Sequence, residues 1–274
     1  MSTRARGFTL VEMVVALTLA AIVVGFGGML LTAPMQHYDL QSRRAELAES
    51  AGAALPRLQD DLRTALPNSA RARRNGSFVA LEFLVAVDWV RYQSSPGAPF
   101  TTSGTFRGLP VPFSATNYFL SVNNLGSGAP GADAWALSGS MTPAGSTIGI
   151  IAGPLAGEQR VTVTPAPVFS ADSPRHRAYL VSGPVTFLCD ESAGTLTRYA
   201  GYAIASTQSA RDTAAELLAA GASARLLAQD ITGCDFAVGA ASQTSAQIVT
   251  ARFSATRAGD TLTLVGQAAL ENLP

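Results

Sequence analysis

The 274-residue chain contains no lysine, only two histidines and two cysteines, and only 14% charged residues. Its 19 basic residues are all arginine and are balanced by 19 acids, so no basic footprint typical of nucleic-acid binding is present. His37 and His176 have no partners at a metal-ligand spacing, and neither a Gly-x-Ser-x-Gly elbow nor a phosphate-binding loop occurs. We therefore expect no catalytic residues, cofactor, metal or nucleic-acid partner, and a protein that is not an enzyme.

A long hydrophobic run lies near the N-terminus, where residues 13–32 are almost entirely apolar and Glu12 directly precedes them. As a helix, these residues would rise about 30 Å, the thickness of the hydrocarbon core of a bilayer. The segment 1–7 is cationic and has no acid, which keeps the N-terminus cytoplasmic by the positive-inside rule. We predict a single membrane pass over residues 8–33, with the remainder of the chain across the membrane.

A cleaved secretory signal peptide and a plain signal anchor are the ordinary alternatives for this segment. The apolar run exceeds the roughly 7–15 residues of a signal-peptide core, and no small-x-small cleavage site follows it cleanly. Glu12 is foreign to both, because a carboxylate in a membrane segment costs several kcal/mol unless it finds a partner or stays near the interface. Glu12 is therefore a candidate functional residue.

Beyond the membrane, the helix is expected to continue over residues 34–67 as an amphipathic segment. Apolar positions recur at intervals of three, four and seven residues and form one stripe: Leu40, Leu47, Ala51, Leu55, Leu58, Leu62 and Leu66. Pro34 lacks an N–H, so a kink or local unwinding is expected there, either as a hinge or as ordinary proline tolerance in membrane helices. Pro67 and Asn68 predict the end of the helix.

Residues 68–274 consist of short β-rich runs separated by Gly, Ser, Pro and Asn. The predicted strands are 78–87, 89–92, 148–151, 160–164, 179–189, 195–202, 247–255 and 261–269. A second helix is predicted over 211–229, and the charge-poor stretch 93–146 is predicted to form long loops with a few short strands. The expected fold class is α+β, with a long N-terminal helix packed on a mostly antiparallel sheet in one head domain.

The two cysteines, Cys189 and Cys234, both lie in the part of the chain that is predicted to be exported. Pairing them in a disulfide is the simplest interpretation in an oxidising compartment, and two free buried thiols are the alternative. Asp190 and Glu191 likewise leave two alternatives open, a cation-binding loop and a solvated turn.

The hexapeptide at residues 7–12, Gly-Phe-Thr-Leu-Val-Glu, resembles the class III processing signal of type IV prepilins and pseudopilins. The resemblance implies that a prepilin peptidase cuts between Gly7 and Phe8 and methylates the new N-terminal Phe8. It also implies that Glu12 pairs with the methylated amine of a neighbouring subunit during assembly. The expected partners are the prepilin peptidase/methylase, other major and minor pilins, the inner-membrane assembly platform and the membrane.

Scattered blocks in the rest of the chain are similar to the MshO-type minor pilins of the mannose-sensitive haemagglutinin (MSHA) pilus. They are 43–47, 61–63, 66–69, 81–84, 181–185 with Cys189, and 196–199. This similarity implies a low-abundance subunit that initiates or caps a pilus, anchored in the bacterial inner membrane with a periplasmic head until assembly brings it to the pilus or cell surface. Two alternatives stay open: a minor pseudopilin of a type II secretion system, and a membrane-anchored periplasmic enzyme or binding domain.

The expected domain plan follows from these segments. It comprises a leader peptide at 1–7, a membrane helix at 8–33, an amphipathic helix at 34–67 and a β-rich head at 68–274.

Overall fold

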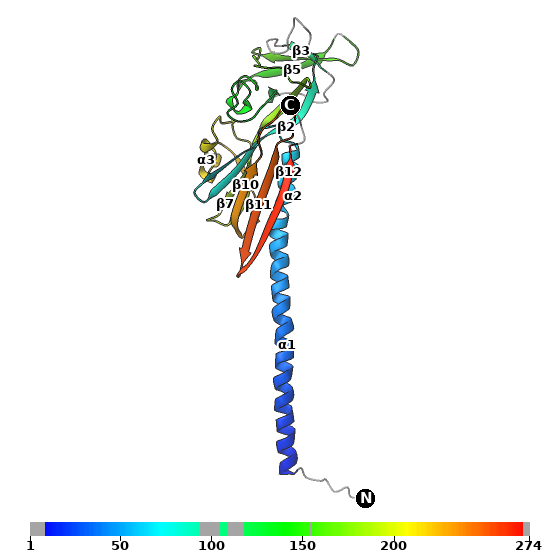
Figure 1. The fold of residues 1–274 in the computed structure, drawn as a ribbon, viewed down its shortest axis with the longest axis vertical. Coiled ribbons are helices and arrows are strands. Elements are labelled where there is room, and N and C mark those ends of the chain that lie inside the picture. Colours follow the sequence, from blue (N-terminus) through cyan, green and yellow to red (C-terminus); the bar gives the residue numbers. More distant parts are fainter. Residues whose placement is uncertain (1–8, 94–104, 109–117, 154, 271–274) are drawn as a thin grey trace. The chain divides into compact units, whose positions relative to one another are not determined.

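The computed structural model describes residues 9–93, 105–108, 118–153 and 155–270, and leaves the side chains of 27–40, 43–44, 50–51 and 105–106 undescribed. The chain divides into two compact units, residues 1–46 and 47–274. The second unit, called the head below, contains the β-strands and begins within the long N-terminal helix (Figure 1).

A break separates the N-terminal helix α1 (Leu10–Gly52) from helix α2 (Ala54–Arg63). Pro56 explains the break, because a helical proline has no N–H and its ring clashes with the carbonyl four residues earlier, which is that of Gly52. Pro56 itself lies in the first turn of α2, where no intrahelical acceptor is needed. The helix runs through Pro34 without interruption, so the expected local unwinding there is wrong; a long helix loses one hydrogen bond at a proline and keeps its neighbours.

The strands of the head form antiparallel sheets, which confirms the expected α+β class. The largest sheet has the order β1-β2-β7-β8-β9, with β4 also pairing with β7. Its strands are β1 (Arg71–Asn75), β2 (Phe78–Arg91), β4 (Phe119–Val122), β7 (Arg177–Asp190), β8 (Thr195–Ala200) and β9 (Ser223–Gln229). A second sheet consists of β10 (Ile231–Val238), β11 (Ile248–Arg257) and β12 (Asp260–Ala269), and a third of β3 (Thr105–Gly108), β6 (Gln159–Thr164) and β5 (Thr147–Ala152).

The long antiparallel ribbon of β2 and β7 extends along much of the head (Figure 1). The sequence predicted two strands, 78–87 and 89–92, where the structure has the single strand β2. Register shifts between Val85 and Asp88 mark a bulge in the middle of this strand. A bulge bends a strand without ending it, so Asp88, which lies between the two predicted strands, is inside the continuous ribbon.

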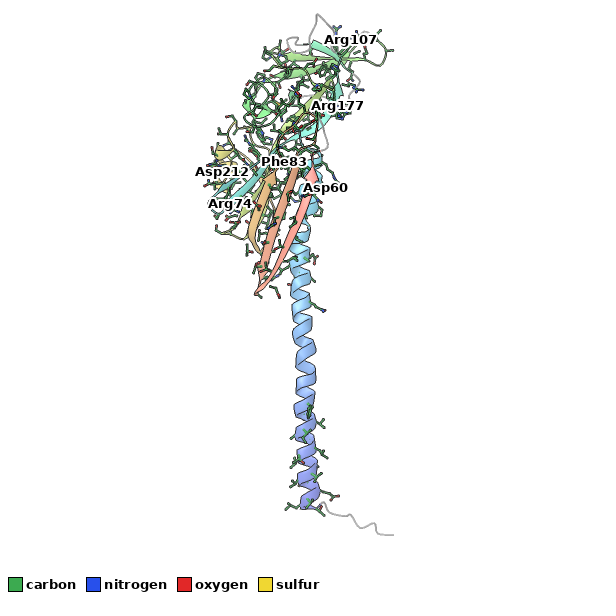
Figure 2. All side chains as sticks on the ribbon, in the orientation of Figure 1. Asp60, Arg74, Phe83, Arg107, Arg177 and Asp212 are labelled. Carbon is green, nitrogen blue, oxygen red and sulfur yellow. A yellow bond between two sulfur atoms is a disulfide. The ribbon has the colours of Figure 1, made fainter. Side chains whose placement is uncertain are left out.

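The main core lies where the helical segment meets two sheets. Leu47, Leu58 and Leu62 are each about 1% exposed and pack with Phe83 and Phe253 in one apolar cluster. Figure 2 marks Phe83 among the side chains of this core. Burial of each such leucine contributes roughly 1.5–3 kcal/mol, so the predicted amphipathic stripe does cover a sheet.

The predicted helix over 211–229 is wrong in its second half. The structure has a short helix α3 (Ala214–Ala219), which begins with a capping box between Thr213 and Glu216. Gly221 has a φ of +86°, a left-handed conformation that stops the helix. The following residues form β9, in which Leu226 pairs with Thr197 of β8. Tertiary pairing therefore overrides the helical spacing of the leucines.

Candidate functional site

A capping box formed by Thr9 and Glu12 closes the N-terminus of α1. The Thr9 hydroxyl accepts a hydrogen bond from the Glu12 N–H at 3.3 Å, and the Glu12 carboxylate accepts one from the Thr9 N–H at 3.2 Å. The Thr9 hydroxyl also donates to the same carboxylate at 3.1 Å. Thr9 is thus the N-cap and Glu12 the third helical residue, which satisfies N–H groups that have no intrahelical acceptor. The carboxylate also interacts favourably with the positive end of the helix dipole.

This capping box gives Glu12 a local structural role that was not among those predicted from the sequence. The signal was present, because Thr-x-x-Glu before an apolar run is the signature of a capping box. Gly7 and Phe8 lie outside the described residues. Both partners of the capping box follow the Gly7–Phe8 bond, so cleavage there would leave the box in the mature chain.

The first turns of α1 expose apolar side chains on every face. All side chains from Thr9 to Phe26 are exposed, with Leu10 at 81% and Phe26 at 66%. Even the Thr18 hydroxyl is satisfied within the helix, because it donates to the carbonyls of Val14 and Val15. Judged on the described residues, no helix combines the length and apolar character needed to cross a membrane. The membrane pass expected over 8–33 therefore stays a prediction.

In the head, Cys189 of β7 and Cys234 of β10 are joined by a disulfide with a Cα–Cα distance of 6.4 Å. The bridge ties the large sheet to the three-stranded sheet of β10, β11 and β12. An ion pair accompanies it: Arg74 donates to the Glu191 carboxylate at 2.7 Å and to the Cys234 carbonyl at 2.7 Å, while Glu191 accepts from the Cys234 N–H at 3.0 Å. The hydrogen bond from Arg74 is the main reason that the pKa of Glu191 lies below its ordinary value.

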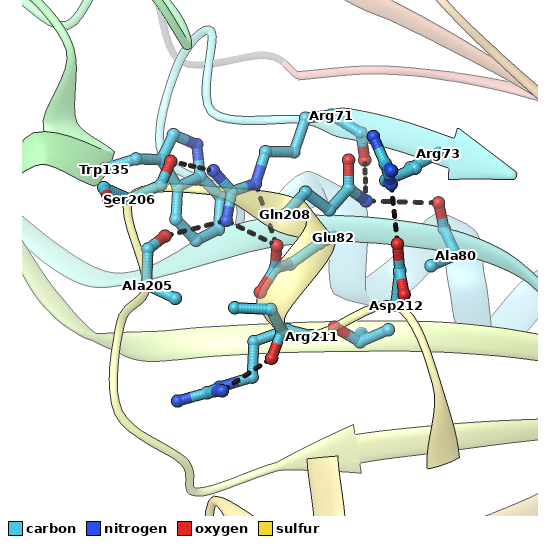
Figure 3. A network of polar contacts seen from close by, with 12 residues as sticks. Arg71, Arg73, Ala80, Glu82, Trp135, Ala205, Ser206, Gln208, Arg211 and Asp212 are labelled. Atoms are coloured by element: carbon cyan, nitrogen blue, oxygen red, sulfur yellow. Dashed lines mark hydrogen bonds and ion pairs between the residues drawn. The ribbon is translucent and has the colours of Figure 1, made fainter. Parts of the chain in front are cut away.

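A buried ion pair between Arg71 of β1 and Glu82 of β2 is the centre of a polar network (Figure 3). The two side chains are 8% and 0% exposed and lie 2.7 Å apart at their closest atoms. The Arg71 guanidinium stacks on the Trp135 ring, 3.6 Å from its centroid. It also donates to the carbonyls of Ala205 and Ser206, both at 2.9 Å. The pair therefore fastens the loop after β8 to the large sheet.

Further polar contacts complete this network. Tyr202 donates to the second carboxylate oxygen of Glu82 at 2.9 Å. Asp212, only 1% exposed, accepts from Arg73 at 2.6 Å and from Asn75 at 2.9 Å. Burial raises the pKa of Glu82 above its ordinary value, while the neighbouring Arg71 acts in the opposite direction. Because two hydrogen bonds and an ion pair with Arg71 close off the Glu82 carboxylate inside the core, the arrangement is a structural clamp rather than an open site.

His176 lies in a turn beside Asp172 and Ser173. Its Nδ1 lies 3.9 Å from the Asp172 carboxylate. The hydroxyl of the adjacent Ser173 is engaged in the turn, where it accepts hydrogen bonds from the N–H groups of Arg175 and Arg177. The side chain of His37 lies outside the described part of α1.

The carboxylates of Asp190 and Glu191 already have partners. Asp190 accepts from the N–H groups of Ser192 and Ala193, both at 3.0 Å, which makes a tight turn after β7. Glu191 belongs to the ion pair with Arg74. Within the described ranges, no group of three His, Cys, Asp or Glu side chains is placed to hold a metal ion. The geometry therefore agrees with the interpretation as a turn.

The comparison with known proteins found a match at the N-terminus. Residues 2–27 match the family described as the prokaryotic N-terminal methylation motif. The match supports a type IV pilin-like protein or pseudopilin. It covers Gly7, Phe8 and Glu12, and such a motif indicates processing by a prepilin peptidase and assembly with other pilins, a structural role rather than an enzymatic one. No curated protein and no solved structure matches the chain.

Proposed function

We propose that the protein is a minor pilin of an MSHA-like type IV pilus, cleaved between Gly7 and Phe8, methylated at Phe8 and assembled into or priming the pilus. The methylation motif over residues 2–27 carries this proposal. The exposed apolar surface of α1 supports it, because such a surface needs lipid or neighbouring helices to cover it. The large head supports a minor role, because a bulky subunit is hard to repeat along a thin filament.

Before assembly, the segment 8–33 anchors the subunit in the inner membrane, with the N-terminus cytoplasmic and the head periplasmic. The disulfide between Cys189 and Cys234 supports a periplasmic head, since disulfides persist in oxidising compartments. The assembly platform in the inner membrane then receives the processed subunit and passes it to the other pilins.

Glu12 has two separable roles in this proposal. Within one chain, it caps α1 through the Thr9 N–H. Between chains, its charge pairs with the methylated amine of Phe8 on a neighbouring subunit, which neutralises both groups in a low-dielectric helical bundle. Glutamine can replace glutamate in a capping box but carries no charge. A comparison of Glu12→Gln with Glu12→Ala therefore separates capping from charge pairing.

We expect both Glu12 variants to be cleaved normally and both to be depleted from sheared filaments, because both lack the charge. Only Glu12→Ala also loses the hydrogen bond between the Thr9 N–H and the side chain of residue 12, while the Thr9 hydroxyl still accepts from the backbone N–H of residue 12 in both variants. Thr9→Ser is the matched control, because it keeps the capping hydroxyl and the charge. Wild-type incorporation of Glu12→Gln would remove the charge role.

Dependence on a prepilin peptidase tests the proposed processing. Co-expression with the peptidase should convert the full chain to a faster-migrating form, and Gly7→Leu should block the conversion. Gly25→Ala is the control glycine variant, because nothing lies within 4 Å of an added Cβ there. A chain that stays uncut beside an active peptidase would contradict the proposal and favour a membrane-anchored periplasmic enzyme or binding domain.

The minor pseudopilin of a type II secretion system is the alternative that shares the same motif. The two assignments differ in where the processed subunit is found and in which system needs it. A pilus subunit should appear in sheared surface filaments and be lost when the pilus platform is deleted. A pseudopilin should stay in the cell envelope, and its deletion should stop protein secretion.

A further inference from the structure

Strand β12 forms one edge of its sheet, and the direction of its backbone groups can be derived. The Leu270 N–H donates to the Gln247 carbonyl, so these residues form a hydrogen-bonded pair with β11. In an antiparallel ladder such pairs alternate along the strand. The even-numbered residues of β12 therefore bond to β11, and the odd-numbered ones direct their N–H and C=O groups to the outer edge. The Gln59 side chain agrees with this parity, because it donates to the outward carbonyl of Gln267 at 3.0 Å.

Three outward residues, Thr261, Thr263 and Val265, leave this edge open. Among the described residues, the hydrogen bond made at this edge goes from Gln59 to the Gln267 carbonyl. Gln267 follows the three open residues in the strand. Their side chains are exposed, with Val265 at 54%. From Thr261 to Ala269 the strand has no charge and no proline. An edge of this kind is a template for pairing with another strand.

The two edge strands of the largest sheet, β1 and β9, are guarded by charge. β1 carries Arg71, Arg73 and Arg74, and β9 carries Arg225. Charged side chains on an edge strand are a common means of preventing edge-to-edge pairing. β5 also lacks charge, but it is shorter than β12 and is interrupted by Gly149. The edge of β12 is thus long, uncharged and rich in β-branched residues, which favour a paired strand.

We propose that β12 pairs antiparallel with β12 of a second copy of this chain, about a two-fold axis at Thr263. In this register Thr263 faces Thr263 of the second copy, and Thr261 faces Val265. The three facing pairs use every outward N–H and C=O of the open stretch. The two three-stranded sheets then form one continuous sheet across the dimer.

The sequence of the edge is complementary to itself in this register, which is why a second copy is the occupant. Thr–Thr and Thr–Val are favourable cross-strand pairs, and no like charges meet. Asp260 would face Gly266, which has no side chain. The paired stretch cannot extend beyond Val265. The next outward residue is Gln267, whose carbonyl already accepts a hydrogen bond from Gln59. In this register Gln267 would also face Gly259, which lies in the turn before β12.

Cysteine cross-linking of the full chain in membranes tests this contact. Facing residues in a hydrogen-bonded pair have Cα atoms about 5.5 Å apart, within disulfide range. Thr263→Cys should therefore form a disulfide-linked homodimer under mild oxidation. Ser254→Cys is the matched control: Ser254 lies beside Thr263 on β11 and shares its hydrogen bond of 3.1 Å, so both variants lose the same contact. The two copies of Ser254 would lie three strand spacings apart, or about 14 Å, which is too far for a disulfide. We expect roughly tenfold more homodimer from Thr263→Cys.

A second pair of variants tests the backbone pairing without a new thiol. Thr263→Pro removes one outward N–H that β11 does not use, whereas Thr263→Val keeps it. Light scattering of the full chain in detergent should show a dimer for wild type and Thr263→Val and a monomer for Thr263→Pro. Equal cross-linking at positions 263 and 254, an unchanged dimer in Thr263→Pro, a monomeric wild type, or cross-linking of the Thr263→Cys variant to a different protein would each overturn the proposal. The contact requires neither cleavage after Gly7 nor filament assembly.

Discussion

Replacing Glu82 with alanine should destabilise the head far more than the loss of an ordinary ion pair. Glu82 is fully buried, and its carboxylate accepts from Arg71 at 2.8 Å and from Tyr202 at 2.9 Å. Alanine would leave the Arg71 guanidinium, only 8% exposed, without a counter-charge in the core. Breaking a buried pair in this way costs about 3–5 kcal/mol. Glu82→Gln keeps the volume and one carbonyl acceptor, so its cost should be smaller.

An exposed ion pair in α2 is the matched control for this prediction. Asp60 and Arg63 lie 3.2 Å apart but are 65% and 62% exposed, so Asp60→Ala should cost less than about 1 kcal/mol. Urea unfolding of the full chain in one detergent gives both values, with tryptophan fluorescence as the signal because Trp135 stacks on Arg71. Equal losses for Glu82→Ala and Asp60→Ala would refute the view that Arg71 and Glu82 clamp the loop after β8 to the sheet.

Three further predictions concern the head. Serine at both Cys189 and Cys234 should lower the free energy of unfolding by about 4 kcal/mol, because the bridge spans a sequence separation of 45; a urea-unfolding midpoint equal to that of wild type would contradict this. Arg74 holds the pKa of Glu191 below 4.5, so this pair's stabilisation is complete above pH 4.5 and is lost as the pH falls through the lowered pKa. Stability measured against pH should therefore fall less steeply on acidification in Glu191→Gln than in wild type, and identical slopes would count against the pair. Leu58→Ala should cost about 3 kcal/mol because Leu58 is 1% exposed in the core, and a loss under about 1 kcal/mol, as at a surface position, would show that α2 does not pack there.

Local patterns predicted those elements whose side chains alternate between core and solvent. The spacing of Leu47, Leu58 and Leu62 predicted a helix with one buried face, and these leucines are buried. The alternation of Thr and Leu in β12 predicted a half-buried strand, and Leu262 and Leu264 do pack against the core. In both cases one periodicity dominates the local sequence.

Other elements depend on partners that are distant in sequence. β9 contains Leu226 and Leu227, which were placed in the predicted helix together with Leu217 and Leu218, yet its pairing with β8 makes it a strand. β1 consists mostly of arginine, and its residues form a strand because Arg71 and Arg73 find buried acids in Glu82 and Asp212. Glu82 lies in the next strand, but Asp212 is 139 residues from Arg73, so no local pattern could predict the whole network.

For the candidate sites too, some features could be predicted from the local sequence and one could not. The motif at residues 7–12 suggested the processing signal directly, and the comparison with known families supports it. The capping box between Thr9 and Glu12 follows a known local signature and was open to prediction. The open edge at Thr263 was not, because it depends on which strands pair and on where Gln59 lies.

Mass spectrometry of the N-terminal peptide, taken from sheared surface filaments and from membranes of the same cells, tests the central claim most directly. A processed pilus subunit gives a peptide that begins at a methylated Phe8 and is present in the filament fraction. The same terminus confined to membranes would favour a pseudopilin or a base-located primer. An intact leader from Met1 in both fractions would contradict the account.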